Sequence, residues 1–187
     1  MTRAESKQQT REAVLAAARD VFARDGFHGA TLDRVAEQAG FTKGAVYSAF
    51  ASKADLFMAV YEARVADRSA RAREEHATFA ESAAATVGEW RGIMREQRGW
   101  SAALTEFWVH ASRHPELRER FRAAHLAWRR TLGSSIEAAA AAEGRRLPMS
   151  GERLATTIMA LGNGLALEGL LGDDETDLLD VVLARLT

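Results

Sequence analysis

The sequence predicts an all-α protein in which a small helix-turn-helix module precedes a larger helical domain, with about nine helices in total. Apolar residues recur at helical spacing along almost the whole chain, and only Pro115 and Pro148 interrupt its 187 residues. Serine or threonine stands where several periodic segments begin, as is typical of helix N-caps. We expect the module to occupy residues 1–55 and the larger domain residues 56–187.

The first expected helix has one apolar face, formed by Val14, Ala17, Ala18, Val21 and Phe22. Gly26 is expected to end it, because glycine readily adopts the left-handed conformation that often follows a helix. The second expected helix has Thr31 as its N-cap and ends at Gly40. The chain thus predicts two helices before residue 41.

Two more helices follow almost without a linker. Thr42 is expected to cap a third helix that turns Val46 and Phe50 inward. The sequence S-K-A-D from Ser52 is typical of a capping box, with Asp55 in the third helical position, and opens a long fourth helix. The tight connection between the second and third helices predicts a helix-turn-helix, whose second helix lies in the DNA major groove.

The third expected helix contains a glycine, although glycine lowers the stability of a helix. Gly44 costs about 1 kcal/mol relative to alanine inside a helix. Without a Cβ atom it lets the backbone approach a phosphate or a base, beside the charge of Lys43 and the hydroxyl of Tyr47. Two structural alternatives fit the same pattern: Gly44 avoids a clash with the second helix, and Tyr47 is half-buried.

The run TLDRVAEQAGFTKGAVYSAFASKADL, from Thr31 to Leu56, resembles the DNA-binding region of TetR-type transcriptional regulators. Ala49 departs from the family pattern, because many members carry His, Asn or Tyr there. The resemblance implies that phosphates are bound by Thr31, Tyr47 and Lys53. It implies that base edges face Thr42, Lys43, Gly44, Ala45 and Ser48, with Arg34 as a further DNA-binding candidate.

The last two expected helices carry apolar stripes. A single module binds too weakly to select one site in a genome, so we expect a homodimer on a palindromic double-stranded DNA operator. The resemblance implies that the last helices pair with those of a second copy. The stripes are Leu154, Ile158, Leu161 and Leu165, then Leu179, Val182, Leu183 and Leu186. The same stripes fit a core within one chain, because periodicity does not distinguish the two.

All four tryptophans lie in the larger domain. The resemblance implies an effector pocket among the middle helices, and large apolar side chains there predict a small hydrophobic or aromatic effector. The candidate pocket residues are Trp90, Met94, Leu104, Phe107, Trp108, His110 and Met159. Ordinary core packing is the alternative for each aromatic residue, because such residues dominate protein cores.

We expect neither a metal site nor a cofactor. Glu106, His110 and His114 share one helical stripe, but this stripe lies to one side of the apolar face and His114 stands directly before Pro115. An enzyme is also disfavoured, because the sequence has no cysteine, no glycine-rich phosphate loop after a strand and no H-E-x-x-H motif. The expected partners are DNA and an effector.

Composition indicates a cytoplasmic protein without a membrane partner. The longest uncharged run, Leu154 to Leu167, is shorter than the ~20 residues that cross a bilayer. The net charge of −1 does not by itself indicate a nucleic-acid binder, so DNA contacts must come from local placement of charge. We therefore expect a ligand-responsive transcriptional repressor. Activation instead of repression stays open, and the alternative function is a helical protein-interaction adaptor that does not bind DNA.

Overall fold

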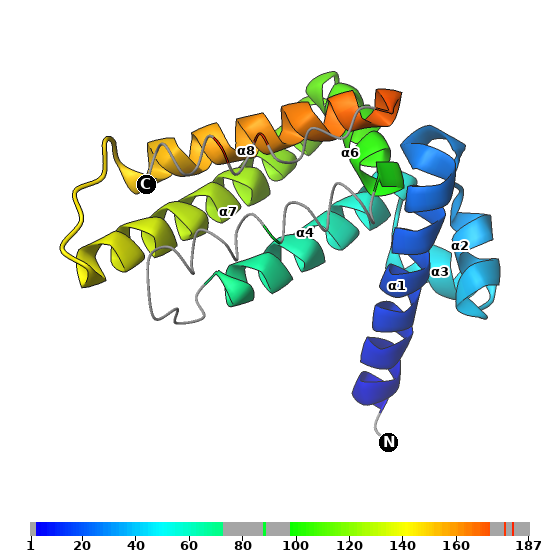
Figure 1. The fold of residues 1–187 in the computed structure, drawn as a ribbon. Helices are drawn as coiled ribbons and strands as arrows, with labels where there is room; N and C mark the ends of the chain where they lie inside the picture. The colour runs from blue at the N-terminus through cyan, green and yellow to red at the C-terminus, as the bar shows by residue number, and fades with distance from the viewer. Residues whose placement is uncertain (1–2, 73–87, 89–97, 173–177, 179–180, 182–187) are drawn as a thin grey trace.

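The computed structural model describes residues 3–72, 88, 98–172, 178 and 181, and within these ranges it is helical with no strand (Figure 1). The described helices are α1 Arg3–Gly29, α2 Leu32–Ala39, α3 Lys43–Ala49, α4 Lys53–Arg71, α6 Arg98–Ser112, α7 Pro115–Ala142 and α8 Gly151–Glu168, followed by the short 3-10 helix η1 Gly169–Leu171. The all-α prediction is confirmed.

The helices form two groups that α4 connects. The first three helices lie together at one end of the molecule, and α1 projects beyond the rest of the chain (Figure 1). The long helices α7 and α8 pack side by side at the other end. Helix α6 contacts both groups, because it packs against α1 as well as α7 and α8.

Helix α1 is interrupted where the sequence predicts its end. Gly26 has φ 71° and ψ 175°, which is outside the helical region. The chain nevertheless resumes one helical turn and α1 ends at Gly29, so the predicted end is three residues early. The N–H of Ala30 donates to the carbonyl of Gly26 at 3.3 Å and closes this extra turn. Gly26 therefore acts as a kink inside α1.

The predicted caps of the next three helices are confirmed. Each N-cap side-chain oxygen accepts a hydrogen bond from a backbone N–H three residues later: Thr31 from Arg34 at 3.2 Å, Thr42 from Ala45 at 3.3 Å, and Ser52 from Asp55 at 3.0 Å. Gly40 is left-handed with φ 71°, and the N–H that follows it donates to Ala36 at 3.0 Å. These local bonds set the bounds of α2, α3 and the start of α4.

A single aromatic core joins the N-terminal helices to α6. Phe57 of α4 stacks on Phe107 of α6 with ring centroids 4.3 Å apart, and on Trp100 at 4.9 Å. Phe27, just after the kink in α1, meets Phe107 edge-on at 5.1 Å. The N-terminal helices are therefore fixed to α6 as well as to α4. The predicted division between residues 55 and 56 falls inside the first turn of α4.

Helices α7 and α8 cross with their backbones close together. A Cβ atom at Gly133 would lie 2.8 Å from the backbone nitrogen of Glu152, so a larger residue does not fit there. A Cβ atom at Gly151 would collide with the carbonyl oxygen of Gly133. The same crossing buries Trp128, Leu132, Ile158 and Met159 in a second apolar cluster.

Candidate nucleic-acid interface and ligand cavity

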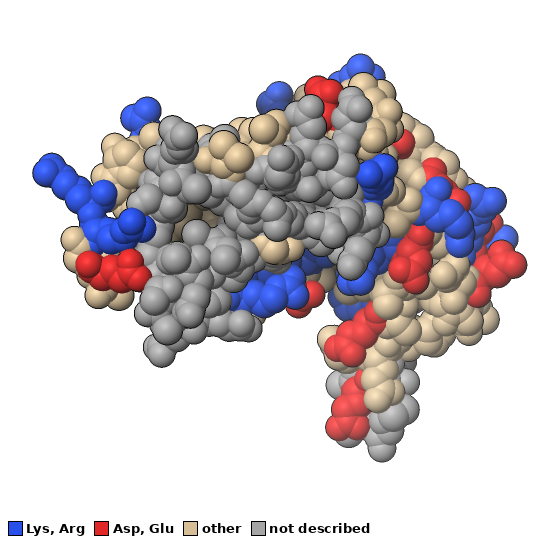
Figure 2. All heavy atoms as spheres, viewed as in Figure 1, with Lys and Arg blue, Asp and Glu red and all other residues tan. Residues whose placement is uncertain are grey.

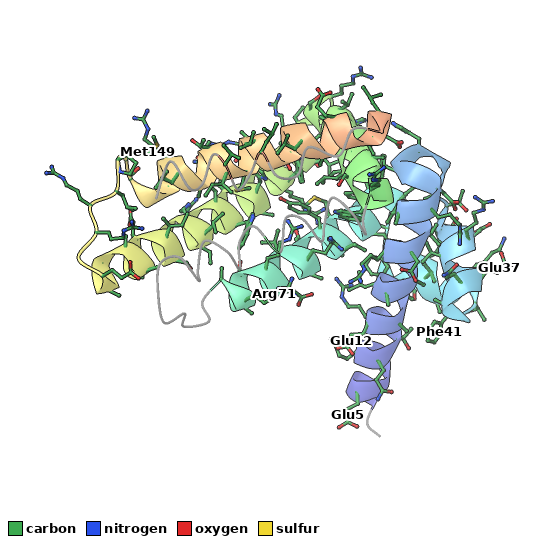
Figure 3. The ribbon with its side chains drawn as sticks, in the orientation of Figure 1. Glu5, Glu12, Glu37, Phe41, Arg71 and Met149 are labelled. Atoms are coloured by element: carbon green, nitrogen blue, oxygen red, sulfur yellow. The ribbon has the colours of Figure 1, made fainter. Side chains whose placement is uncertain are left out.

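The α2–α3 unit lies beside α1, away from the loop that joins α7 to α8 (Figure 1). Figure 3 labels Glu37 on α2 and Phe41 in the turn that leads to α3, both within this unit. Acidic and basic side chains alternate over the face shown in Figure 2 and form no single basic surface there.

Helix α3 buries one side and leaves the other open. Val46 is fully buried, and Phe50, the C-cap residue of α3, is 4% exposed, so both point inward as the sequence predicts. Tyr47 is 54% exposed, so its side chain is accessible to solvent although nearly half of its surface is covered. A Cβ atom at Gly44 would meet no described heavy atom within 4 Å, so a clash with α2 does not explain this glycine. Packing within the described chain gives no reason for Gly44.

The positive charge on α3 is held in an exposed ion pair. The ammonium of Lys43 pairs with the carboxylate of Asp33 on α2 at 2.5 Å. This pairing lowers the pKa of Asp33 and raises the pKa of Lys43. Water screens such a surface pair, so exchanging Asp33 for a phosphate costs Lys43 little. Ser48 is also exposed, and its hydroxyl donates to the carbonyl of Ala45 at 2.8 Å.

Two predicted phosphate or base contacts, Arg34 and Lys53, are bound to the chain itself. Arg34 donates to a carboxylate oxygen of Asp25 at 2.9 Å, which connects α2 to α1. Lys53 donates to the carbonyl of His28 at 2.8 Å and lies over the ring of Phe27 at 4.9 Å. Burial lowers the pKa of Lys53, partly offset by the negative charge of Glu106. Both therefore have structural roles that the sequence did not reveal, and their DNA contacts stay predictions.

Helix α6 contacts α1 at the kink. A carboxylate oxygen of Glu106 accepts the backbone N–H of His28 at 2.9 Å. A Cβ atom on Gly26 would lie 2.7 Å from the same carboxylate, and the φ of 71° at this position itself favours glycine. About two turns earlier on α6, a Cβ atom at Gly99 would collide with the carbonyl of Ala23. Glu106 is thus a connecting residue between α6 and α1.

The histidines beside Glu106 do not form a metal centre with it. Among the described residues, no three His, Cys, Asp or Glu side chains are placed to share a metal ion. The rings of His110 and His114 lie 4.2 Å apart, and Nδ1 of His114 is 2.7 Å from the carbonyl oxygen of His110. His110 packs against Phe27 with centroids 4.9 Å apart. The pair belongs to the α1–α6 contact.

A cavity that forms a cleft partly open to solvent lies between α4, α6 and α8, and the space of about 560 Å³ within it includes open solvent. Its apolar wall is formed by Trp100, Leu104, Trp108, Ala166 and Leu167. Its polar wall is formed by Arg68, Ser101, Thr105 and Asn163. The α6 residues recur at positions i, i+4 and i+8, so their spacing alone indicates a common face.

The predicted pocket residues fall into three groups. Leu104 and Trp108 line the cavity. Phe107 and Met159 are buried in the two cores, and His110 faces α1, so these three do not border it. Trp90 and Met94 lie outside the described residues. The prediction missed the two polar side chains from other helices, Arg68 and Asn163, because only tertiary packing brings them to α6.

The stripe of α8 that sequence analysis assigned to a dimer interface points largely into the chain. Leu154 is 3% exposed and Ile158 is 5% exposed, and Leu161 and Leu165 pack partly against the α7–α8 core. These side chains leave little surface for a second copy. The other four members, Leu179, Val182, Leu183 and Leu186, lie outside the described residues.

The opposite face of α8 is open and uncharged. It exposes Thr157, Ala160, Gly164, Leu167 and Leu171. No charged residue occurs between Arg153 and Glu168. By length and composition alone, Gly151–Leu171 is apolar enough to cross a membrane, and core helices of soluble proteins meet the same criterion. Of its most apolar stretch, 28% is buried within the chain.

Comparison with known families identifies both parts of the chain. Residues 14–60 match the model of bacterial regulatory proteins of the tetR family. Residues 81–186 match the model of the C-terminal domain of BetI-type transcriptional repressors. The transcriptional repressor AcnR of Corynebacterium efficiens is 30% identical over 116 residues, covering 60% of this chain and 56% of the relative. The chain spans less than two thirds of the length of the curated relatives that it matches.

Solved structures show the same fold over almost the whole chain. The transcriptional regulator FadR of Bacillus subtilis, in complex with stearoyl-CoA, is similar with a TM-score of 0.75, 18% identity and coverage of 94% and 96% of the two chains. A regulator of Saccharomonospora viridis, in complex with choline, is similar with a TM-score of 0.74, 21% identity and 95% coverage of both. At these identities the likeness concerns the fold alone.

Proposed function

Because the chain belongs to the TetR family of DNA-binding transcriptional regulators, which are not enzymes, we propose that it is a ligand-responsive repressor. It binds a palindromic operator as a homodimer in the cytoplasm and is released by a small, largely apolar effector. Repression is supported by the match to the C-terminal domain of BetI-type transcriptional repressors and by the similarity to the repressor AcnR. An adaptor that binds only protein is the alternative.

Gly44 is the observation that carries the DNA-binding proposal. It stands on the exposed side of α3, where a Cβ atom would touch nothing in the described chain. A glycine in a helix lowers its stability, and no intrachain contact compensates for that loss here. A close external partner explains the residue, and the second helix of a helix-turn-helix meets the DNA major groove.

The exposed residues on and beside α3 divide by the contact they offer. Tyr47 and the exposed Thr31 have hydroxyls for phosphate oxygens, which position the protein without reading sequence. Thr42, Lys43, Gly44, Ala45 and Ser48 are the proposed base-facing set. Only Lys43 among them has a long donor, and lysine suits the acceptor edge of guanine. Two copies are needed, because this set offers few strong contacts.

We place the homodimer contact on the outward face of α8. This face has no charge between Arg153 and Glu168. Gly164 lies in its middle, and a Cβ atom there would meet nothing within 4 Å in the described chain. Small residues let a second helix approach closely and bury the exposed Leu171 of η1, while Leu167 lines the cavity.

Effector binding is coupled to DNA binding through α6. The cavity residues occupy one side of this helix, and Gly99, Glu106 and Phe107 hold α1 and α4 from the other side. A ligand that binds more tightly to the conformer with α6 in one place than to the conformer with α6 in another shifts the kinked end of α1. The start of α4 moves with it, because Lys53 is bonded to His28. The effector acts only through this difference in affinity between conformers.

A salt titration of operator binding tests the proposal against the adaptor alternative. DNA flanking the protein's own gene is footprinted, and affinity for the protected segment is then measured by fluorescence anisotropy at several salt concentrations. A dimer using a few phosphate contacts per subunit gives a log-log slope of about −4 to −8. No protected segment and no binding at low salt would contradict the proposal.

A further inference from the structure

An arginine of α1 lies against the end of α3. The guanidinium of Arg11 lies over the ring of Phe50, the C-cap residue of α3, at 4.8 Å from the ring centroid. Phe50 is 4% exposed, whereas Arg11 is exposed, so the guanidinium lies on the surface above a core ring. A guanidinium that stacks by its face keeps its N–H donors at its edge, because they lie in its plane. Arg11 therefore presents hydrogen-bond donors to solvent beside α3.

No carboxylate shares the helical face of Arg11. The residues three and four positions away are Lys7, Gln8, Val14 and Leu15. The adjacent Glu12 accepts a hydrogen bond from the side-chain amide of Gln8 at 2.7 Å. In the part of the chain that the structure describes, Arg11 forms no ion pair, and its contact is the stacking on Phe50. The charge of Arg11 is therefore not neutralised by a described acidic residue.

Four other cations near α3 differ from Arg11 because each has an acceptor within the chain. The pairs are Arg24 and Arg34 with Asp25, Lys43 with Asp33, and Lys53 with the carbonyl oxygen of His28. Each of these cations must exchange or share its acceptor before it binds a phosphate. Arg11 has no described acceptor to exchange, so a phosphate adds a bond to it without breaking another.

The place of Arg11 fits the edge of a DNA groove. The major groove is about 12 Å wide. Helix α3 has seven residues and is therefore about 10 Å long, which nearly fills that width. When α3 lies in the groove, a group beside its end is close to the phosphates that border the groove. Arg11 is such a group, because Phe50 directly follows α3 and stands three residues after Tyr47.

We propose that Arg11 binds a phosphate of the operator backbone and so extends the DNA interface from α3 to α1. This inference rests on the proposed function, because it adds a contact to the same complex. The phosphate accepts charge-assisted hydrogen bonds from the edge of the guanidinium, while the ring of Phe50 fixes its plane. The contact positions the protein and reads no base, because every nucleotide has the same phosphate.

Salt titrations of wild type and Arg11→Gln count this contact. Affinity of the full chain for the operator and for an unrelated duplex of equal length is measured by fluorescence anisotropy at several salt concentrations. Each phosphate contact contributes about −0.9 to the log-log slope, so the slope for a dimer should become shallower by about 2. Affinity at low salt should fall at least about tenfold, and equally for both duplexes.

Two results of these titrations would overturn the proposal. An unchanged slope would show that Arg11 binds no phosphate, even if the affinity or the stability of the protein fell. A loss confined to the operator would make Arg11 a base contact instead. If Arg11→Gln does not fold, as judged by circular dichroism, Arg11→Met decides, because it keeps an apolar stem against Phe50 and lacks the charge.

Two further variants separate a local contact from the total charge. Arg11→Lys keeps the charge and is expected to have a slope close to that of wild type. Arg130→Gln is the matched control, because it removes the same charge from an exposed site on α7, which packs against α4, α6 and α8. We expect its slope to be unchanged. Equal losses of slope in Arg130→Gln and Arg11→Gln would overturn the proposal.

The wild-type titration distinguishes failure of this contact from failure of the repressor proposal. A wild type that binds its operator, with the same slope in Arg11→Gln, contradicts the contact and leaves the repressor proposal standing. A wild type that binds neither duplex at low salt contradicts both.

Discussion

Helices α3 and α6 each present a functional face, but only the face of α3 is evident from the sequence. On α3 the predicted DNA-facing residues Lys43, Tyr47 and Ser48 are exposed and Ala45 is partly exposed, whereas Val46 and Phe50 are buried. On α6 the predicted pocket residues divide, because Leu104 and Trp108 line the cavity while Phe107 and His110 face α1 and α4. When a helix packs on one side only, its own sequence predicts which side chains are exposed. When a helix packs on two sides, its neighbours decide which of its side chains line a cavity and which are buried.

The largest effect is expected where α6 meets α1. In Gly99→Ala the new Cβ atom collides with the backbone carbonyl of Ala23, which cannot move like a side chain. We expect the free energy of unfolding, measured in urea, to fall by about 1–3 kcal/mol. Gly44→Ala is the control and should lose no stability, because its Cβ atom meets only open space. Equal stability of Gly99→Ala and wild type would show that the two helices are not in fixed contact.

The sequence predicted the first four helices because their signals are local. Thr31, Thr42 and Ser52 bond to backbone groups three residues away, and Gly40 ends α2 through its own conformation. The extra turn after Gly26 was missed, because the carboxylate that packs against the kink comes from Glu106, far along the chain. For the apolar stripe of α8 the sequence left a dimer interface and an intrachain core both open, because only the packing of α7 distinguishes them.

Substitution of Glu106 is expected to change the response to effector more than the affinity for DNA. Glu106→Ala removes the acceptor for the N–H of His28, and we expect the effector-induced loss of operator affinity to shrink severalfold while affinity without effector changes less. Glu106→Gln keeps an acceptor oxygen and is expected to respond nearly as wild type does. Anisotropy with and without effector measures both quantities. Normal coupling in Glu106→Ala would remove α6 from the mechanism.

Removal of the hydroxyl oxygen of Tyr47 tests whether the open side of α3 contacts DNA. Tyr47→Phe removes the proposed phosphate contact from a side chain that is 54% exposed, so folding is unaffected. We expect operator affinity to fall about fivefold, as the loss of one hydrogen bond predicts, and to fall equally for operators of different sequence. Sedimentation should still show a dimer. A loss confined to one operator sequence would instead make Tyr47 a base contact.

The smallest expected effect is the contribution of His125, in the larger domain, to the pH dependence of folding stability. His125 lies 3.1 Å from the hydroxyl of Tyr61, and burial, aided by the charge of Arg129, lowers its pKa in the folded state. The unfolded chain therefore binds a proton first as pH falls, near the ordinary histidine pKa of about 6.5. Stability should decline from about pH 7 to pH 5, and less steeply in His125→Gln. Identical slopes would contradict this assignment.

Gly44→Ala tests most directly whether the open side of α3 is shaped by DNA. The methyl group enters space that is empty in the described chain, so the protein should be as stable as wild type or more stable, by up to about 1 kcal/mol. Operator affinity, measured on the same sample by anisotropy, should fall about tenfold or more, because the methyl group holds the backbone away from the DNA. Unchanged affinity with unchanged stability would contradict the account.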